Sequence, residues 1–138
     1  MSLTLMKIVV PISLVLLLVV VSEALIFPKQ VHLEVTNRLS NKRELYLHCY
    51  ERYGDDLGEY ILFPGGQFIY SFKPRIIGKS SKYYCSVKWI GSNLKWFDLW
   101  SQGRDSNAGQ FIKWTLEENE ACRFDNTGSN YLCVAYNP

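Results

Sequence analysis

The sequence of 138 residues predicts an all-β domain of about eight antiparallel strands, built as a β-sandwich or a closed barrel and preceded by an export signal. Three observations predict it. Apolar and polar residues alternate with period two in short runs, which turn-forming residues separate. Beyond residue 30, no segment has a sustained helical period with caps. The four cysteines are an even number, as is typical of small exported domains.

The first 24 residues have the order of a secretory signal peptide. Lys7 precedes an aliphatic run at 8–21, and Ser22-Glu23-Ala24 follows with small residues at its first and third positions. The run has 14 residues, whereas a helix needs roughly 20 to cross the hydrocarbon core of a bilayer. We therefore expect cleavage after Ala24, with a single mature domain at 25–138. A retained signal anchor and a shifted cleavage site are the alternatives.

The strands are expected where alternation or β-branched and aromatic content is strongest. In order, these runs lie at 31–36, 45–50, 68–72, 83–89, 94–100, 111–116 and 132–136. Turn sequences rich in Gly, Asn, Asp, Pro and Ser separate them, at 37–41, 55–58, 64–66, 77–79, 91–93, 103–109 and 125–130. The repeated strand-and-turn pattern predicts one compact domain with almost no α-helix.

The four cysteines are expected to form two disulfides in an exported chain, and they are Cys49, Cys85, Cys122 and Cys133. Three pairings are possible, and the spacing does not choose among them. Because the sequence has no Cys-x-x-Cys motif and only two histidines, neither a zinc site nor a redox site is expected.

The charge and the polar residues predict no catalytic group, metal or cofactor. A net charge of +2 is too weak to indicate nucleic acid as a partner. His48 adjoins Cys49, but strand neighbours point to opposite faces, so the imidazole would not address that sulfur. The carboxylates of Asp55 and Asp56 fall far short of the six to eight oxygens that calcium takes. We expect them in a turn for which Gly58 supplies a permissive backbone.

The aromatic residues, 14% of the chain, are expected mainly in the core. Trp96 and Trp100 share one parity along their strand, whereas Phe97 and Leu99 share the other. This strand therefore has large apolar groups on both faces, and one face is a candidate edge or binding surface.

The order of short motifs resembles the plant self-incompatibility S1 family, also called S-protein homologues. The motifs include VHLEVTN at 31–37, LYLHC at 45–49, DDLG at 55–58, GQFIYSF at 66–72, FDLW at 97–100 and ACRF at 121–124. The resemblance covers essentially the whole mature chain. It implies a small secreted plant β-sandwich held by two disulfides. The best understood type of member is a stigma-secreted ligand that a pollen membrane receptor recognises.

The leading functional hypothesis is a secreted, monomeric, non-enzymatic ligand for a plasma-membrane receptor protein on another cell, in self-incompatibility or related communication. Loops suit recognition because the sheets fix their ends. The candidate residues are Asp55, Asp56, Lys73, Arg75, Lys79 and Lys82, with Arg104 and Asp105 expected to be exposed. The four basic residues at 73–82 either steer the protein toward an acidic receptor face or simply keep the loop soluble.

The alternative is a secreted defence protein or toxin with weak enzymatic or carbohydrate-binding activity. A histidine, His32 or His48, in a cleft beside a carboxylate would favour an enzyme. An exposed Trp96 or Trp100 would favour carbohydrate binding.

Overall fold

The structure is a computed structural model that describes residues 3–26, 29–75, 77–125 and 131–138. Its elements in chain order are α1 (Leu3–Ile26), β1 (Val31–Asn37), β2 (Leu45–Glu51), β3 (Asp56–Leu62), β4 (Gln67–Phe72), β5 (Lys82–Lys88), β6 (Lys95–Ser101), α2 (Gln102–Asp105), β7 (Phe111–Leu116), β8 (Glu120–Asp125) and β9 (Tyr131–Ala135). Most of the turn predicted at 125–130 lies outside the described residues.

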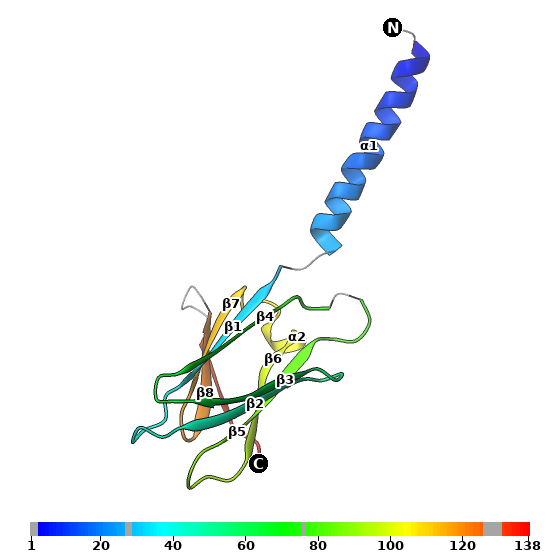
Figure 1. Cartoon of the computed structure of the whole chain (residues 1–138). Coiled ribbons are helices and arrows are strands. Elements are labelled where there is room, and N and C mark those ends of the chain that lie inside the picture. The colour runs from blue at the N-terminus through cyan, green and yellow to red at the C-terminus, as the bar shows by residue number, and fades with distance from the viewer. Residues whose placement is uncertain (1–2, 27–28, 76, 126–130) are drawn as a thin grey trace.

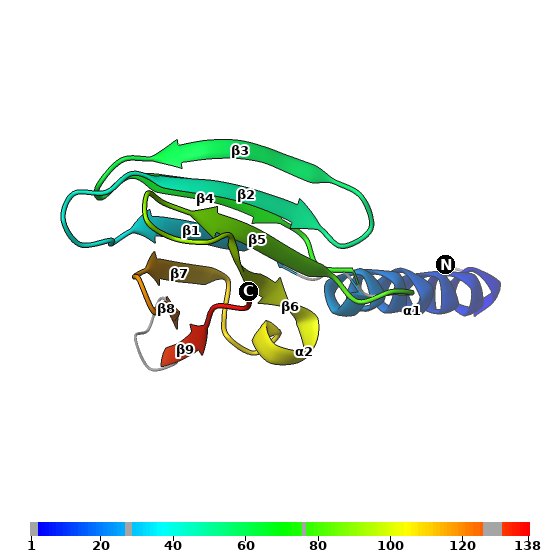
Figure 2. The same cartoon turned by 90° about the horizontal axis from the view of Figure 1, so that it is seen from below.

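Two sheets face each other and form a β-sandwich, so the predicted fold class is confirmed (Figures 1 and 2). One sheet has the strand order β4-β1-β7-β8-β9, and the other has the order β3-β2-β5-β6. The β1–β7 pair is parallel, whereas the other paired strands are antiparallel. The predicted antiparallel pairing therefore holds for every described pair except β1–β7, which joins strands far apart in the chain.

The N-terminal helix α1 is drawn outside the two sheets in Figure 1. Its described side chains, at residue 7 and at 9–19, are all exposed. Within the described residues, no helix has the combined length and apolar character that crossing a membrane requires.

Strand β3 begins where the sequence analysis expected a turn. Its residues are mostly exposed and do not alternate clearly, because β3 is an edge strand of its sheet. The predicted turn chemistry is nevertheless present at its start. The Gly58 N–H donates to the Asp56 carboxylate over 2.8 Å, and Gly58 has a φ of 94°. Asp56 is thus part of a local turn and is also the first residue of β3.

The core fills the space between the sheets with aromatic and aliphatic side chains. Trp100 and Phe97 of β6 and Trp114 of β7 are almost fully buried. The indole N–H of Trp114 donates to the Leu99 carbonyl at 2.9 Å, which joins the two sheets through a satisfied buried donor. The prediction that most tryptophans lie in the core is confirmed, while Trp96 lies only partly buried on the same strand.

The disulfides pair Cys49 with Cys85 and Cys122 with Cys133. In both cases the two cysteines are direct register partners on neighbouring strands, β2 with β5 and β8 with β9. Each disulfide therefore crosslinks two neighbouring strands within one sheet, and neither connects the two sheets.

A buried carboxylate links the two sheets where the sequence predicted an exposed loop. Asp105 is 1% exposed and forms ion pairs with Arg104 at 2.7 Å and with Arg123 of β8 at 2.9 Å. Its carboxylate also accepts from the Ser101 N–H at 2.9 Å. The expectation that Arg104 and Asp105 are exposed was wrong, because α2 folds the carboxylate inward to neutralise the buried Arg123 guanidinium.

Replacing the buried carboxylate should destabilise the fold strongly. Asp105→Asn leaves the Arg123 charge buried without an anion, so we expect the free energy of unfolding in urea to fall by about 3 kcal/mol or more. The matched control is Asp98→Asn, because Asp98 pairs with Lys82 at 3.6 Å on a partly exposed surface, and its loss should cost less than about 1 kcal/mol. Equal losses in the two variants would contradict this role of Asp105.

The two disulfides should contribute unequally. Sequence separations of 36 and 11 residues correspond to about 4 and about 3 kcal/mol in the chain-entropy estimate. Paired alanine substitutions at Cys49 and Cys85 should therefore lower unfolding stability more than those at Cys122 and Cys133. Urea titrations of both double variants would measure the order, and a greater loss from the shorter loop would oppose the prediction.

Candidate recognition surfaces

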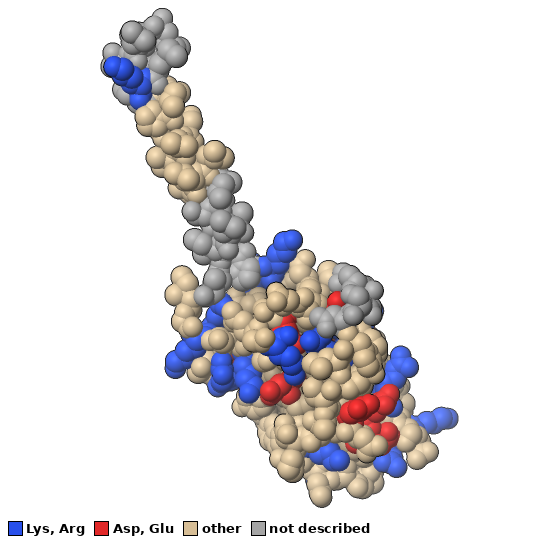
Figure 3. All heavy atoms as spheres, turned by 180° about the vertical axis from the view of Figure 1, so that it is seen from behind, with Lys and Arg blue, Asp and Glu red and all other residues tan. Residues whose placement is uncertain are grey.

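Three cations surround one tyrosine at an end of the sandwich. The β2–β3 turn presents the Tyr53 ring, and the cationic groups of Arg52, Arg75 and Lys79 lie 4.9, 5.2 and 4.6 Å from its centre. Tyr53 is 44% exposed. Cations at such distances from an aromatic face are attracted by its quadrupole. We call these four residues the Tyr53 cluster. Lys and Arg side chains gather at this end of the molecule in Figure 3.

A buried acid and several backbone contacts hold the Tyr53 cluster together. The Glu51 side chain is 4% exposed and pairs with the Arg75 guanidinium at 3.2 Å. The other Glu51 oxygen accepts from the Tyr53 N–H at 2.7 Å. The Arg75 N–H donates to the Ser81 hydroxyl at 2.7 Å, which closes the β4–β5 loop on itself just before β5 begins. Two loops distant in sequence therefore form one surface.

The structure brings together only part of the predicted set of recognition residues. Arg75 and Lys79 join the Tyr53 cluster, whereas Lys73 is exposed outside it and Lys82 pairs with Asp98. The Asp55 carbonyl accepts from the Glu51 N–H at 2.8 Å, so its backbone shapes the β2–β3 turn.

Arg52 and Tyr53 were missed by the sequence analysis. The signal that could have found them is an aromatic residue beside a basic residue in a glycine-containing turn. Their proximity to Arg75 and Lys79 depends on the approach of two loops.

His48 lies beside carboxylates, which is the arrangement that the sequence analysis set as favouring an enzyme. Its Nε2 is 2.7 Å from Asp56 Oδ1, while its Nδ1 is 3.2 Å from Glu59 Oε1 and 2.9 Å from the Tyr50 hydroxyl. Hydrogen bonds from the Gly58 N–H and from His48 hold the pKa of Asp56 below its ordinary value.

Ser86 and His48 are not arranged as a nucleophile and its base. Ser86 is the register partner of His48 on β5. Both imidazole nitrogens already face other groups, however, so neither is placed to accept a proton from that hydroxyl. His32 contacts the Ser71 hydroxyl at 2.7 Å and stacks on Phe111, a hydroxyl and an apolar ring.

Glu120, Cys122 and Cys133 place three potential metal-ligand atoms within 4.8 Å of one another. The two sulfurs are bonded to each other in a disulfide, and metals bind cysteine as the thiolate. The donor set therefore does not fit a metal ion.

Comparison with known proteins identifies the family to which the chain belongs. The family model of plant self-incompatibility protein S1 matches residues 32–136, a range that begins in β1 and ends after β9. S-protein homolog 29 of Arabidopsis thaliana is 31% identical over 104 residues, which cover 75% of each chain. S-protein homolog 4 of the same plant is 32% identical over 108 residues, covering 75% of this chain and 70% of the relative. The predicted family resemblance is confirmed, and the chain belongs to the plant self-incompatibility protein S1 family.

Proposed function

We propose that the protein is a secreted, non-enzymatic ligand that a receptor protein in the plasma membrane of another cell recognises. Membership of the S1 family supports a role in self-incompatibility or in related communication between plant cells. The observation that carries the recognition step is the Tyr53 cluster, where two loops present three cations around one exposed aromatic ring.

Export is supported by the character of the N-terminal segment and by the disulfides. Helix α1 is strongly apolar, and its described side chains, at residue 7 and at 9–19, are all exposed. Among the residues whose side chains the structure describes, the core begins at Val31 and includes none from 1–24, which is compatible with cleavage after Ala24. Two structural disulfides suit an oxidising compartment.

A non-enzymatic role is supported by the chemistry of the candidate groups. All four cysteines are oxidised and therefore are not nucleophiles. The two imidazole nitrogens of His48, on β2, contact Asp56 and Glu59 of β3. These contacts favour a role in holding β2 to β3 over a role in proton transfer.

The Tyr53 cluster has the composition of a protein-binding hot spot. Tyrosine and arginine are enriched among the residues that carry binding energy at interfaces. The net charge of the chain is only +2, so the cations in this cluster create a local field that the whole molecule lacks. Such a field increases the rate of encounter with an acidic receptor face. The ligand would act as a monomer, with this end toward the receptor.

Charge reversal in the Tyr53 cluster should weaken binding to cells. Arg52→Glu with Lys79→Glu reverses two exposed cations and leaves the buried Glu51–Arg75 pair intact. We expect saturable binding of the labelled protein to intact pollen or other plant cells to weaken about tenfold or more, mainly through slower association.

The matched control reverses two exposed lysines away from this cluster, with Lys42→Glu and Lys113→Glu, and should bind as the unchanged protein does. Absence of saturable binding of the unchanged protein to any tissue at about micromolar concentration would contradict the receptor-ligand proposal. Equal weakening in both double variants would contradict the assignment to the Tyr53 cluster.

Cleavage is testable separately. Protein recovered from the medium of expressing plant cells should begin at Leu25 when its N-terminus is sequenced. Recovery only in the membrane fraction, with residues 1–24 still attached, would support a signal anchor instead.

A further inference from the structure

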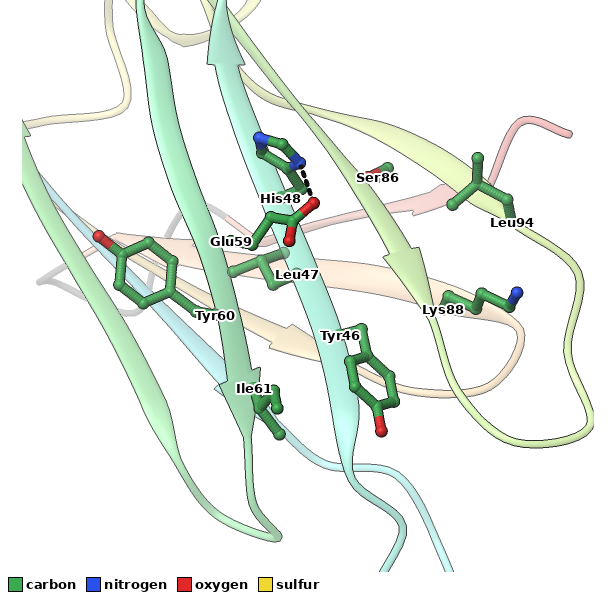
Figure 4. Close-up of a pocket in the computed structure, with 9 residues that line it drawn as sticks. All are labelled: Tyr46, Leu47, His48, Glu59, Tyr60, Ile61, Ser86, Lys88 and Leu94. Atoms are coloured by element: carbon green, nitrogen blue, oxygen red, sulfur yellow. Dashed lines mark ion pairs between the residues drawn. The ribbon is translucent and has the colours of Figure 1, made fainter.

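A second surface lies on the outer face of the four-stranded sheet, and the proposed function does not use it. It is a hollow of about 490 Å³ over β3, β2 and β5 (Figure 4). The short Ser86 side chain faces His48 across the β2–β5 pair and leaves space beside it. The nine lining residues are Tyr46, Leu47, His48, Glu59, Tyr60, Ile61, Ser86, Lys88 and Leu94.

The hollow offers both hydrogen-bond donors and acceptors. Glu59 comes from β3 and has a side chain that is 82% exposed, and Lys88 comes from the end of β5 and is also exposed. Within the described residues, the Lys88 ammonium has no hydrogen bond or ion pair. The Ser86 and Tyr46 hydroxyls can each donate and accept. A ligand held here would need both kinds of group.

The lining charges balance, and apolar surface lies between them. Lys88 and Glu59 contribute one charge of each sign from different strands. Ile61 and Leu94 are about half exposed, at 52% and 48%, and Tyr46 is 45% exposed. A sugar ring matches this mixture, because its hydroxyls donate and accept while its C–H face packs on an aromatic ring. A purely apolar ligand would instead desolvate both charges without compensation.

Aromatic rings continue from the hollow across the same face. The His48 ring stacks on Tyr50 with centroids 4.2 Å apart, Tyr50 stacks on Tyr84 at 5.4 Å, and the Trp96 ring lies 5.9 Å from Tyr84. From Tyr46 to Tyr50 the strand itself spans about 13 Å. The surface is therefore longer than one sugar ring. Of the two tryptophans weighed for carbohydrate binding, Trp96 lies by this face, whereas Trp100 is buried in the core.

We propose that this groove binds a neutral oligosaccharide, with the Tyr46 ring as the stacking platform and Glu59, Ser86 and Lys88 as hydrogen-bonding partners of its hydroxyls. The site is separate from the Tyr53 cluster in its residues and in its charge, so either surface can act without the other.

The test is a titration of isotopically labelled protein, followed by NMR, with neutral hexasaccharides of glucose, xylose and mannose. A galacturonic acid hexasaccharide serves as the charged comparison. We expect saturable shifts from at least one neutral sugar at the backbone amides of Tyr46, Glu59 and Lys88. Tyr46→Ala should weaken that binding about tenfold or more, whereas Tyr46→Phe, which keeps the ring, should weaken it less.

The matched control is Phe111→Ala, which removes a similarly exposed ring from β7 of the other sheet and should leave binding unchanged. Amide dispersion in each spectrum confirms that the variant is folded. Absence of saturable shifts with every neutral sugar at about 10 mM would overturn the proposal. Binding of the acidic sugar alone, or unchanged binding by Tyr46→Ala, would overturn it as well. The receptor test substitutes Arg52 and Lys79, which do not line the hollow, whereas the sugar test substitutes Tyr46. The two tests can therefore fail independently.

Discussion

The packing of the two sheets at one end of the sandwich depends on the ion pair between the buried Asp105 carboxylate and Arg123. The disulfides each staple a single sheet, so the two sheets are held to each other by the apolar core and by polar links such as this one. Asp105 receives the Ser101 N–H and the Arg104 guanidinium from its own segment, and it neutralises Arg123 of the opposite sheet. Arg104 also lies over the Trp114 ring at 5.3 Å, which couples the ionic cluster to the aromatic core. A buried charge of this kind is tolerated only with its partners in place, and it therefore fixes how α2 and β8 meet.

Alternation along the chain was sufficient to predict the strands that have one face in the core. It failed at β3 because an edge strand with mostly exposed residues has little contrast between its faces. It failed at β8 because Ala121, Cys122 and Arg123 are buried in succession, which removes the period of two. The burial of Arg123 depends on Asp105, a residue 18 positions earlier in the numbering. Neither that contact nor the parallel pairing of β1 with β7 follows from local periodicity, since both join segments distant in the chain.

The candidate sites, too, were predictable only where their residues follow a local sequence pattern, and not where the fold brings distant segments together. The basic residues of the β4–β5 loop predicted a recognition role for it, and two of them, Arg75 and Lys79, do lie in the Tyr53 cluster. Arg52 and Tyr53 complete that surface because tertiary contacts, among them the buried Glu51–Arg75 ion pair and the hydrogen bond from Arg52 to the Ser80 carbonyl, hold the two loops together. On the outer face of the four-stranded sheet, by contrast, every second residue of β2 contributes, and Tyr46, His48 and Tyr50 share one parity that the sequence already displays. The protein thus presents a cationic end and a mixed aromatic and polar face on one rigid framework.

Protection of lysines from acetylation tests most directly whether the end bearing the Tyr53 cluster meets the receptor. Protein bound to the surface of plant cells would be treated briefly with an acetylating reagent, recovered and compared with free protein by mass spectrometry. Selective protection of Lys79, with Lys42 and Lys113 modified as in the free protein, is the predicted result. Protection of Lys42 or Lys113 with Lys79 still fully modified would contradict it, because the receptor would then cover another part of the molecule.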